Sequence, residues 1–215
     1  MNLLWALIGG LAGWRTGMTS PGAVAKVRAT GHTWGEAHVS ETRWLPLVTA
    51  VVSAGAWFAL ARRFDHDASV VAFGLMVLWG VRVSLVDIDT HVVTPTSIVR
   101  AVLWSVPVLC LLAFVDDSGS VSGMFLGSFA VFVTMKVLQV LSRGDLGGGD
   151  VRLGTVFALY AGWTGTDGAF VALVTGFVVA GMVAIVLLLA RRAGRRTFVP
   201  FGPFLFIGTL VAVLR

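Results

Sequence analysis

Four aspartates stand at the ends of apolar segments, where a carboxylate is costly to keep charged. They are Asp87, Asp89, Asp145 and Asp150. Acidic residues beside hydrocarbon are rare and mark functional sites by default. Asp87 directly follows one apolar run, and Asp150 directly precedes another. If two such carboxyls meet from different helices, they share a proton, because both cannot ionise cheaply at short range.

A pair of this kind has the chemistry of an aspartic peptidase. The ionised carboxyl takes a proton from water while the protonated one polarises the scissile carbonyl. Asp150 follows three consecutive glycines, Gly147, Gly148 and Gly149. Glycines permit backbone angles closed to other residues and let another chain approach closely. We therefore predict that these glycines shape the approach of a peptide, although the spacing alone equally allows Asp150 to be a helix N-cap after a flexible turn.

The composition requires a lipid environment. The chain has 215 residues, of which 57% are hydrophobic and 13% charged, and its mean hydropathy is +0.89. Soluble domains carry roughly one quarter charged residues. The net charge of +5 does not indicate a nucleic-acid partner, because the basic residues lie between apolar runs and form no basic stripe. We expect the lipid bilayer to be a partner and nucleic acid not to be one.

The apolar runs predict an all-α fold, a polytopic membrane bundle of about eight transmembrane helices in a single domain spanning residues 1–215. About 20 apolar residues cross a bilayer, with roughly 17 to 25 tolerated. Residues 15–43 show no apolar period, so we predict a loop there. The predicted spans are residues 2–14, 44–61, 68–86, 98–115, 123–141, 151–163, 169–190 and 198–214.

The basic residues predict the orientation of these spans. With eight spans, one set of alternate loops and flanks holds 13 of the 16 Lys and Arg residues. Loops rich in Lys and Arg stay in the cytoplasm. We therefore predict a multi-pass protein of the inner or plasma membrane with residues 15–43 and both candidate aspartates, Asp87 and Asp150, in cytoplasmic loops. Both termini then lie outside.

Three motifs resemble those of the type IV prepilin peptidase family, and they follow one another along the chain in the order that the family shows. Residues 147–150 form a Gly-x-Gly-Asp motif that continues as Asp-Val-Arg-Leu, and residues 84–93 resemble the segment that carries the first catalytic aspartate. Residues 200–203, Pro-Phe-Gly-Pro, resemble the start of the last helix in the family. The resemblance covers roughly residues 44–214. It implies a membrane aspartic endopeptidase, with Asp87 and Asp150 catalytic, that removes the leader peptide of type IV prepilins or pseudopilins at the cytoplasmic membrane face.

Two features depart from the family pattern. The family proline would fall at Thr94, whereas the chain has Pro95. Many family members carry two Cys-x-x-Cys pairs in the first cytoplasmic loop, with the spacing of zinc ligands, but residues 15–43 contain no cysteine. We therefore predict a short form that acts as a peptidase, requires no metal or organic cofactor and does not use S-adenosylmethionine for N-methylation.

Several alternatives remain open from the sequence. Asp89 is a second candidate for the first catalytic acid. His32, Glu36 and His38 could hold a metal, but polar loop residues of this kind are more often solvated. An ion-coupled transporter would also place carboxylates in the membrane, although it would favour acids near the midplane and an internal repeat. A non-catalytic scaffold of a pilus or secretion system would keep the fold and would need neither aspartate.

Overall fold

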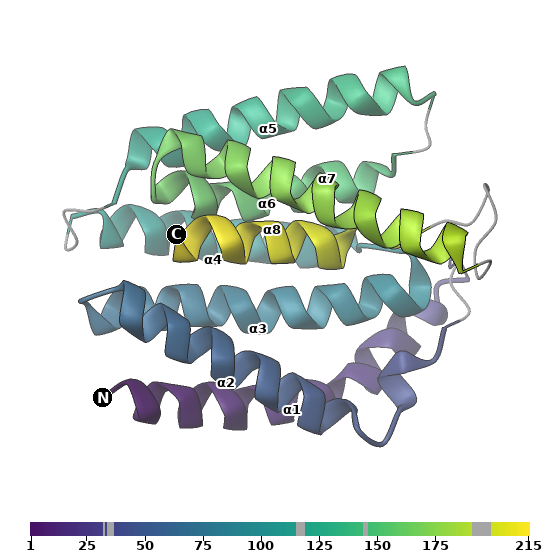
Figure 1. Ribbon diagram of the computed structural model, residues 1–215, viewed down its shortest axis with the longest axis horizontal. Coiled ribbons are helices and arrows are strands. Elements are labelled where there is room, and N and C mark those ends of the chain that lie inside the picture. Colours follow the sequence, from purple (N-terminus) through teal and green to yellow (C-terminus); the bar gives the residue numbers. More distant parts are fainter. Residues whose placement is uncertain (32, 34–36, 115–118, 144–145, 191–198) are drawn as a thin grey trace.

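The computed structural model describes residues 1–31, 33, 37–114, 119–143, 146–190 and 199–215. Within these ranges the chain is helical and has no β-strand. The helices are α1 (Asn2–Arg28), the 3-10 turn η1 (Val39–Glu41), α2 (Leu45–Arg63), α3 (Asp67–Thr90), α4 (Pro95–Leu112), α5 (Val121–Leu141), α6 (Gly148–Trp163), α7 (Thr166–Leu189) and α8 (Gly202–Leu214) (Figure 1).

The predicted helical membrane bundle is confirmed. Five helices of the described chain, α2, α3, α4, α5 and α7, are long and apolar enough to cross a membrane, and α8 is a shorter apolar helix. Many large side chains on α5 and α7 are exposed, among them Phe129, Val140 and Leu189. Because water would not favour such a surface, these faces suit contact with lipid.

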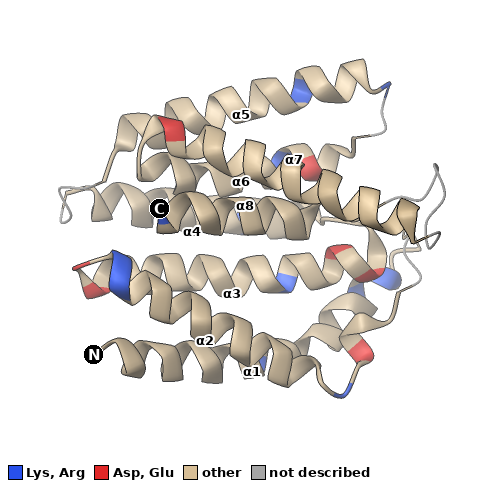
Figure 2. Cartoon of the chain, viewed as in Figure 1, with Lys and Arg blue, Asp and Glu red and all other residues tan. Residues whose placement is uncertain are grey.

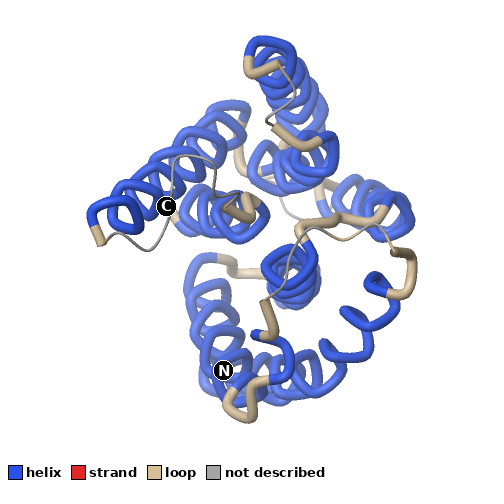
Figure 3. The backbone as a smooth tube through the Cα atoms, turned by 90° about the vertical axis from the view of Figure 1, so that its right-hand side faces the viewer, coloured by secondary structure: helices blue, strands red, loops and turns tan. Residues whose placement is uncertain are grey.

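α3 lies at the centre of the bundle (Figure 3). In its most apolar window 67% of the residues are buried, whereas the other four candidate spans have between 17% and 28% of theirs buried. The N- and C-termini lie at one end of the molecule (Figure 1). The end of α3 and the start of α6 lie at the opposite end, and both are marked by acidic residues (Figure 2).

Aromatic contacts tie α3 to α6 and α8. Trp79 of α3 packs on Phe157 of α6, with ring centroids 5.3 Å apart, and Phe157 in turn packs on Phe206 of α8 at 5.8 Å. Toward the other end, Phe73 of α3 meets Tyr160 edge-on at 5.5 Å. These rings bury large apolar surfaces between the three helices, so they fix the spacing of the helices that carry the two candidate acids.

The prediction of a loop over residues 15–43 is wrong for its first half, because α1 continues as a helix to Arg28. Pro21 lies inside this helix. This part of α1 is helical because it packs closely on α2. Its sequence has no apolar period, so the pattern did not reveal the helix. Gly9, Gly13 and Gly17 recur every four residues, so they lie on one face of α1, and all three are buried.

The three glycines allow the backbones of α1 and α2 to approach closely. A Cβ atom at Gly13 would lie 2.5 Å from the carbonyl oxygen of Thr49 and 2.6 Å from the Ser53 side chain. Small residues at such crossings are typical of membrane helices, where packing rather than hydrophobicity drives association.

Gly13→Ala should therefore lower the stability of the protein, by about 1 to 3 kcal/mol for an overpacked contact. Gly22→Ala provides the matched control on the same helix, because a Cβ there meets no heavy atom within 4 Å. Alanine favours a helix interior over glycine by about 1 kcal/mol, so this control should be neutral or stabilising. Thermal unfolding of the purified variants in detergent measures both. Equal unfolding temperatures would contradict the close packing of α1 on α2.

Candidate active site

Asp87 lies in the last turn of α3 and not in the loop that the sequence predicted. Its residue surface is only 4% exposed. The carboxylate Oδ2 accepts a hydrogen bond from the backbone N–H of Gly202 at 2.8 Å. A buried carboxylate needs such donors to offset the loss of water.

The partner of Asp87 explains the Pro-Phe-Gly-Pro sequence at the start of α8. Phe201 is the N-cap of this helix and Gly202 its first residue. A Cβ atom on Gly202 would lie 2.8 Å from the Asp87 Oδ2 and 3.2 Å from a methyl carbon of Leu153. The N-terminus of a helix also carries partial positive charge, which stabilises a nearby anion. Sequence reasoning recognised this motif but assigned Gly202 no role in the site.

Asp150 lies in the first turn of α6, and Gly147 is the N-cap of that helix. The alternative interpretation of Asp150 as a helix N-cap is therefore wrong, as is the prediction that it lies in a loop. Asp150 is half-buried and precedes the apolar part of α6. Its carboxyl is close enough to Asp87 for the two charges to repel each other. The structure thus brings together the two acids that the sequence selected.

The surroundings of Asp150 raise the pKa of its carboxyl to about 7. Burial is the main cause, because it penalises the charged form, and the negative charge of Asp87 adds to it. A backbone hydrogen bond from Gly147 opposes both effects. Asp150 therefore keeps its proton up to a much higher pH than an exposed aspartate does.

The three glycines before Asp150 cap and begin α6. Gly148 and Gly149 are the first residues of α6. Gly147 has φ −63° and ψ 141°, which other residues also adopt. Gly147 and Gly149 leave room because they have no side chain. A Cβ atom on Gly147 would lie 3.0 Å from the Asp150 Oδ2, and a Cβ atom on Gly149 would lie 3.3 Å from Val93. Gly147 and Gly148 are exposed, so the surface beside Asp150 is open at this point.

Asp89 contacts a different part of the protein. It is fully buried, and its two oxygens accept the backbone N–H groups of Val39 and Ser40, both at 2.9 Å. These bonds attach η1 to the end of α3. Both oxygens of Asp89 are thus occupied by hydrogen bonds that hold the fold together.

The structure describes only part of the candidate metal site. Among the described residues, no group of three His, Cys, Asp or Glu side chains could hold a metal ion. His32, Glu36 and Asp145 lie outside the described residues. His91 ends α3 in the left-handed conformation, with φ 53°.

A direct test of the pairing uses the carboxyl of Asp150. In the wild-type protein it should be protonated below pH 7 and ionised above it. Asp87→Asn removes the neighbouring negative charge, so the pKa of Asp150 should fall, yet it should stay above the usual 3.8 because burial remains the largest cause. Infrared difference titration of the protonated carboxyl band, assigned with Asp150→Asn, measures this. An unchanged titration in Asp87→Asn would mean that the two acids do not interact.

The curated proteins that match this chain all have the same name. No protein-family model matches it, and no solved structure matches it. It is 30% identical over 146 residues to the prepilin leader peptidase/N-methyltransferases of Stutzerimonas stutzeri and Pseudomonas aeruginosa, which covers 65% of this chain and 48% of each relative. The protein of the same name from Bacillus subtilis is 26% identical over 168 residues, which covers 78% of this chain and 63% of the relative.

The chain thus spans about half the length of the first two relatives. Five curated proteins with this name match it at 26% to 30% identity, and the helical membrane bundle accords with them. These similarities relate the chain to the prepilin leader peptidases over about two thirds of its length or more.

Proposed function

We propose that this protein is a membrane aspartic endopeptidase that removes the leader peptide of type IV prepilins or pilin-like proteins, with Asp87 and Asp150 as its catalytic pair. One observation carries the proposal: carboxyls from α3 and α6 interact at one end of the helical bundle, and the pKa of one is raised to about 7. The names of the relatives support the substrate class.

The geometry supports a division of labour between the two acids. Asp87 is assigned the role of the ionised acid, since the N–H of Gly202 donates to it at the start of α8 and favours its charged form. Asp150 holds the proton. The carboxylate of Asp87 accepts a proton from a water molecule as the water oxygen attacks the scissile carbonyl carbon, and Asp150 donates a hydrogen bond to the carbonyl oxygen. When the C–N bond breaks, the leaving nitrogen takes up the proton that Asp87 accepted from water, so that Asp87 returns to its carboxylate form and a free carboxyl and a free amine result.

The substrate would approach over the exposed glycines. Gly147, Gly148 and Gly149 leave the surface beside Asp150 without side chains, which lets an extended peptide backbone lie close to the carboxyl. The apolar helix of the pilin-like substrate would pack beside the enzyme in the bilayer. No metal or organic cofactor takes part in this hydrolysis.

The charge distribution supports the predicted orientation. The end of the bundle that carries Asp87 and Asp150 is the end whose flanking segments are rich in Lys and Arg, so we place it at the cytoplasmic face of the inner or plasma membrane. N-Methylation, which forms part of the relatives' names, is not included in the proposal. The chain spans about half of the first two relatives, and residues 15–43 contain none of the cysteines of the longer family members.

The proposal predicts that Asp87→Asn and Asp150→Asn each abolish leader removal. Loss of one acid–base partner should slow cleavage by about 10²- to 10⁴-fold. The measurement is co-expression of the full chain with candidate prepilins from the same genome, scored by gel shift and by sequencing of the new N-terminus. Membrane levels of each variant are measured in parallel, since a misfolded enzyme would also be inactive.

Asp89→Asn is the matched comparison in the same turn of α3. It should weaken the attachment of η1, because one carboxylate oxygen becomes an NH₂ group facing a backbone N–H. Cleavage per folded molecule should nevertheless persist. Cleavage by Asp87→Asn together with its loss in folded Asp89→Asn would transfer the catalytic assignment to Asp89. A folded wild-type protein that cleaves no candidate would favour the non-catalytic scaffold.

Gly202→Ala should also inactivate the enzyme while leaving both carboxyls in place. The new methyl group would displace either Asp87 or the start of α8, because it would lie 2.8 Å from the Asp87 Oδ2. Gly55→Ala on α2 is the control, since a Cβ there would meet no heavy atom within 4 Å. The same cleavage assay should show activity retained in Gly55→Ala and lost in Gly202→Ala. Full activity in Gly202→Ala would show that its close contact with Asp87 is unnecessary.

A further inference from the structure

A basic pocket lies between the C-terminal part of α1, α3 and the start of α4. Its volume is about 660 Å³. Three cationic side chains line it: Lys26 from α1, Arg82 from α3 and Arg100 from α4. The indoles of Trp79 and Trp104 form part of the wall. The proposed peptidase mechanism uses none of these five residues.

The charged side chains that line this pocket are all positive. No acidic side chain is among its lining residues, and all three cations are exposed. The ion pairs found among the described residues, Arg28–Glu41 and Arg215–Asp167, lie outside it. The pocket therefore concentrates positive charge that nothing in its lining neutralises.

Of the three cations, Arg82 has the greatest need of an anionic partner. It belongs to α3, a candidate membrane span, where an arginine is costly unless it meets a partner or water. Its side chain contacts the hydroxyl of Thr19 at 3.5 Å, which is a long hydrogen bond. An anion bound in the pocket would supply a negative charge to pair with the Arg82 guanidinium.

The rest of the lining is amphipathic. Thr96 and Ser97 also line the pocket, and the Ser97 hydroxyl accepts a hydrogen bond from the indole N–H of Trp79 at 3.2 Å. Next to Arg100, the side chains of Val99 and Leu103 are 55% and 69% exposed on α4, where lipid would cover them. Cations, indoles and an adjoining apolar helix face are what a lipid meets at the membrane interface.

We propose that this pocket binds the phosphate headgroup of an anionic phospholipid. Lys26, Arg82 and Arg100 hold the phosphate, while the exposed face of α4 accommodates an acyl chain. Basic pockets between membrane helices at the cytoplasmic side bind lipid headgroups in this way. A lipid is favoured over a soluble anion because two of the three cations, Arg82 and Arg100, come from candidate spans and the pocket adjoins a lipid-facing helix.

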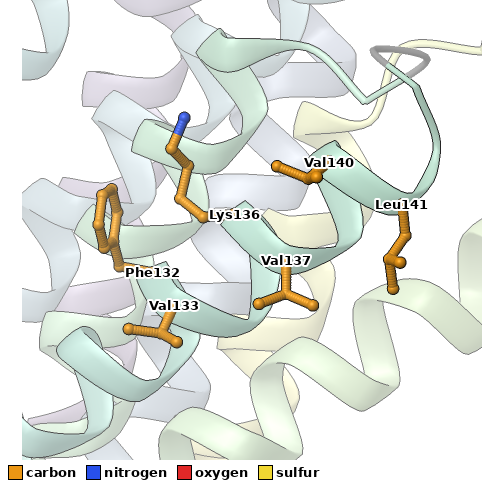
Figure 4. Close-up of a pocket in the computed structure, with 6 residues that line it drawn as sticks. All are labelled: Phe132, Val133, Lys136, Val137, Val140 and Leu141. Atoms are coloured by element: carbon orange, nitrogen blue, oxygen red, sulfur yellow. The ribbon is translucent and has the colours of Figure 1, made fainter.

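A second hollow in the surface provides the comparison that the test needs. It lies on α5 and is lined by Phe132, Val133, Lys136, Val137, Val140 and Leu141 (Figure 4). Its single cation, Lys136, donates to the amide oxygen of Gln139 at 2.8 Å. A lone cation in an apolar setting should hold a phosphate weakly, so Lys136→Gln is the matched control for loss of one positive charge.

The experiment measures how much phosphatidylglycerol stays bound to the purified full chain by native mass spectrometry, with phosphatidylcholine as the uncharged comparison. Wild type and Lys136→Gln should retain phosphatidylglycerol in preference to phosphatidylcholine. Arg82→Gln, Arg100→Gln and Lys26→Gln should each lower the preference several-fold, and a double substitution by on the order of tenfold or more. If Arg82→Gln fails to fold, the exposed Arg100 and Lys26 still provide the test.

Three results would overturn the proposal. The first is equal retention of the two lipids by wild type. The second is an equal loss of phosphatidylglycerol from Lys136→Gln and from the pocket variants. The third concerns the source of the phosphate: if inorganic phosphate raises the unfolding temperature of wild type as much as phosphatidylglycerol does, and pocket variants lose both effects, the site takes a soluble anion. Stabilisation by the lipid alone supports the proposal. None of these readouts depends on peptidase activity.

Discussion

The hydrogen bond from the Gly202 N–H to Asp87 is the contact on which the arrangement of the site depends. It joins the first residue of α8 to the last turn of α3 across 115 positions of sequence. Leu153 of α6 packs against the same glycine position, so three helices converge on one buried carboxylate. Such a contact cannot tolerate a side chain at Gly202, and it places the positive end of a helix beside an acid that has little water around it.

Two aspartates that lie two residues apart on α3 have different environments because of helix geometry. Positions i and i+2 are about 200° apart around a helix with 3.6 residues per turn, so Asp87 and Asp89 face different neighbours. Asp89 accepts the backbone N–H groups of Val39 and Ser40 and holds η1 in place. Asp87 faces α8 and the acid on α6. The same residue type thus serves the fold at one position and is available for chemistry at the other.

The sequence predicted well what local composition determines and missed what distant contacts determine. The eight helices are predicted from the lengths of the apolar runs. The two candidate acids, Asp87 and Asp150, are selected by their positions at the ends of those runs. The helix over residues 15–28 was missed because its packing face contains a glycine, Gly17, which reads as a loop residue until the α2 backbone beside it is known. The roles of Gly202 and Asp89 depend on partners 115 and about 50 residues away, which no pattern within one segment could have predicted.

The difference in burial between the two acids bears on how a membrane bundle prepares acid–base chemistry. Asp87 is buried, whereas Asp150 keeps partial access to solvent at the start of α6. Burial near hydrocarbon is the largest cause of the raised pKa of Asp150, so the bundle itself keeps a proton available near neutral pH. Helix ends provide this burial while remaining within reach of water and of a peptide, which a carboxyl at the bilayer midplane would not be. Backbone N–H groups donate to both acids, whereas a salt bridge to a carboxyl would favour its ionised form more strongly and lower its pKa.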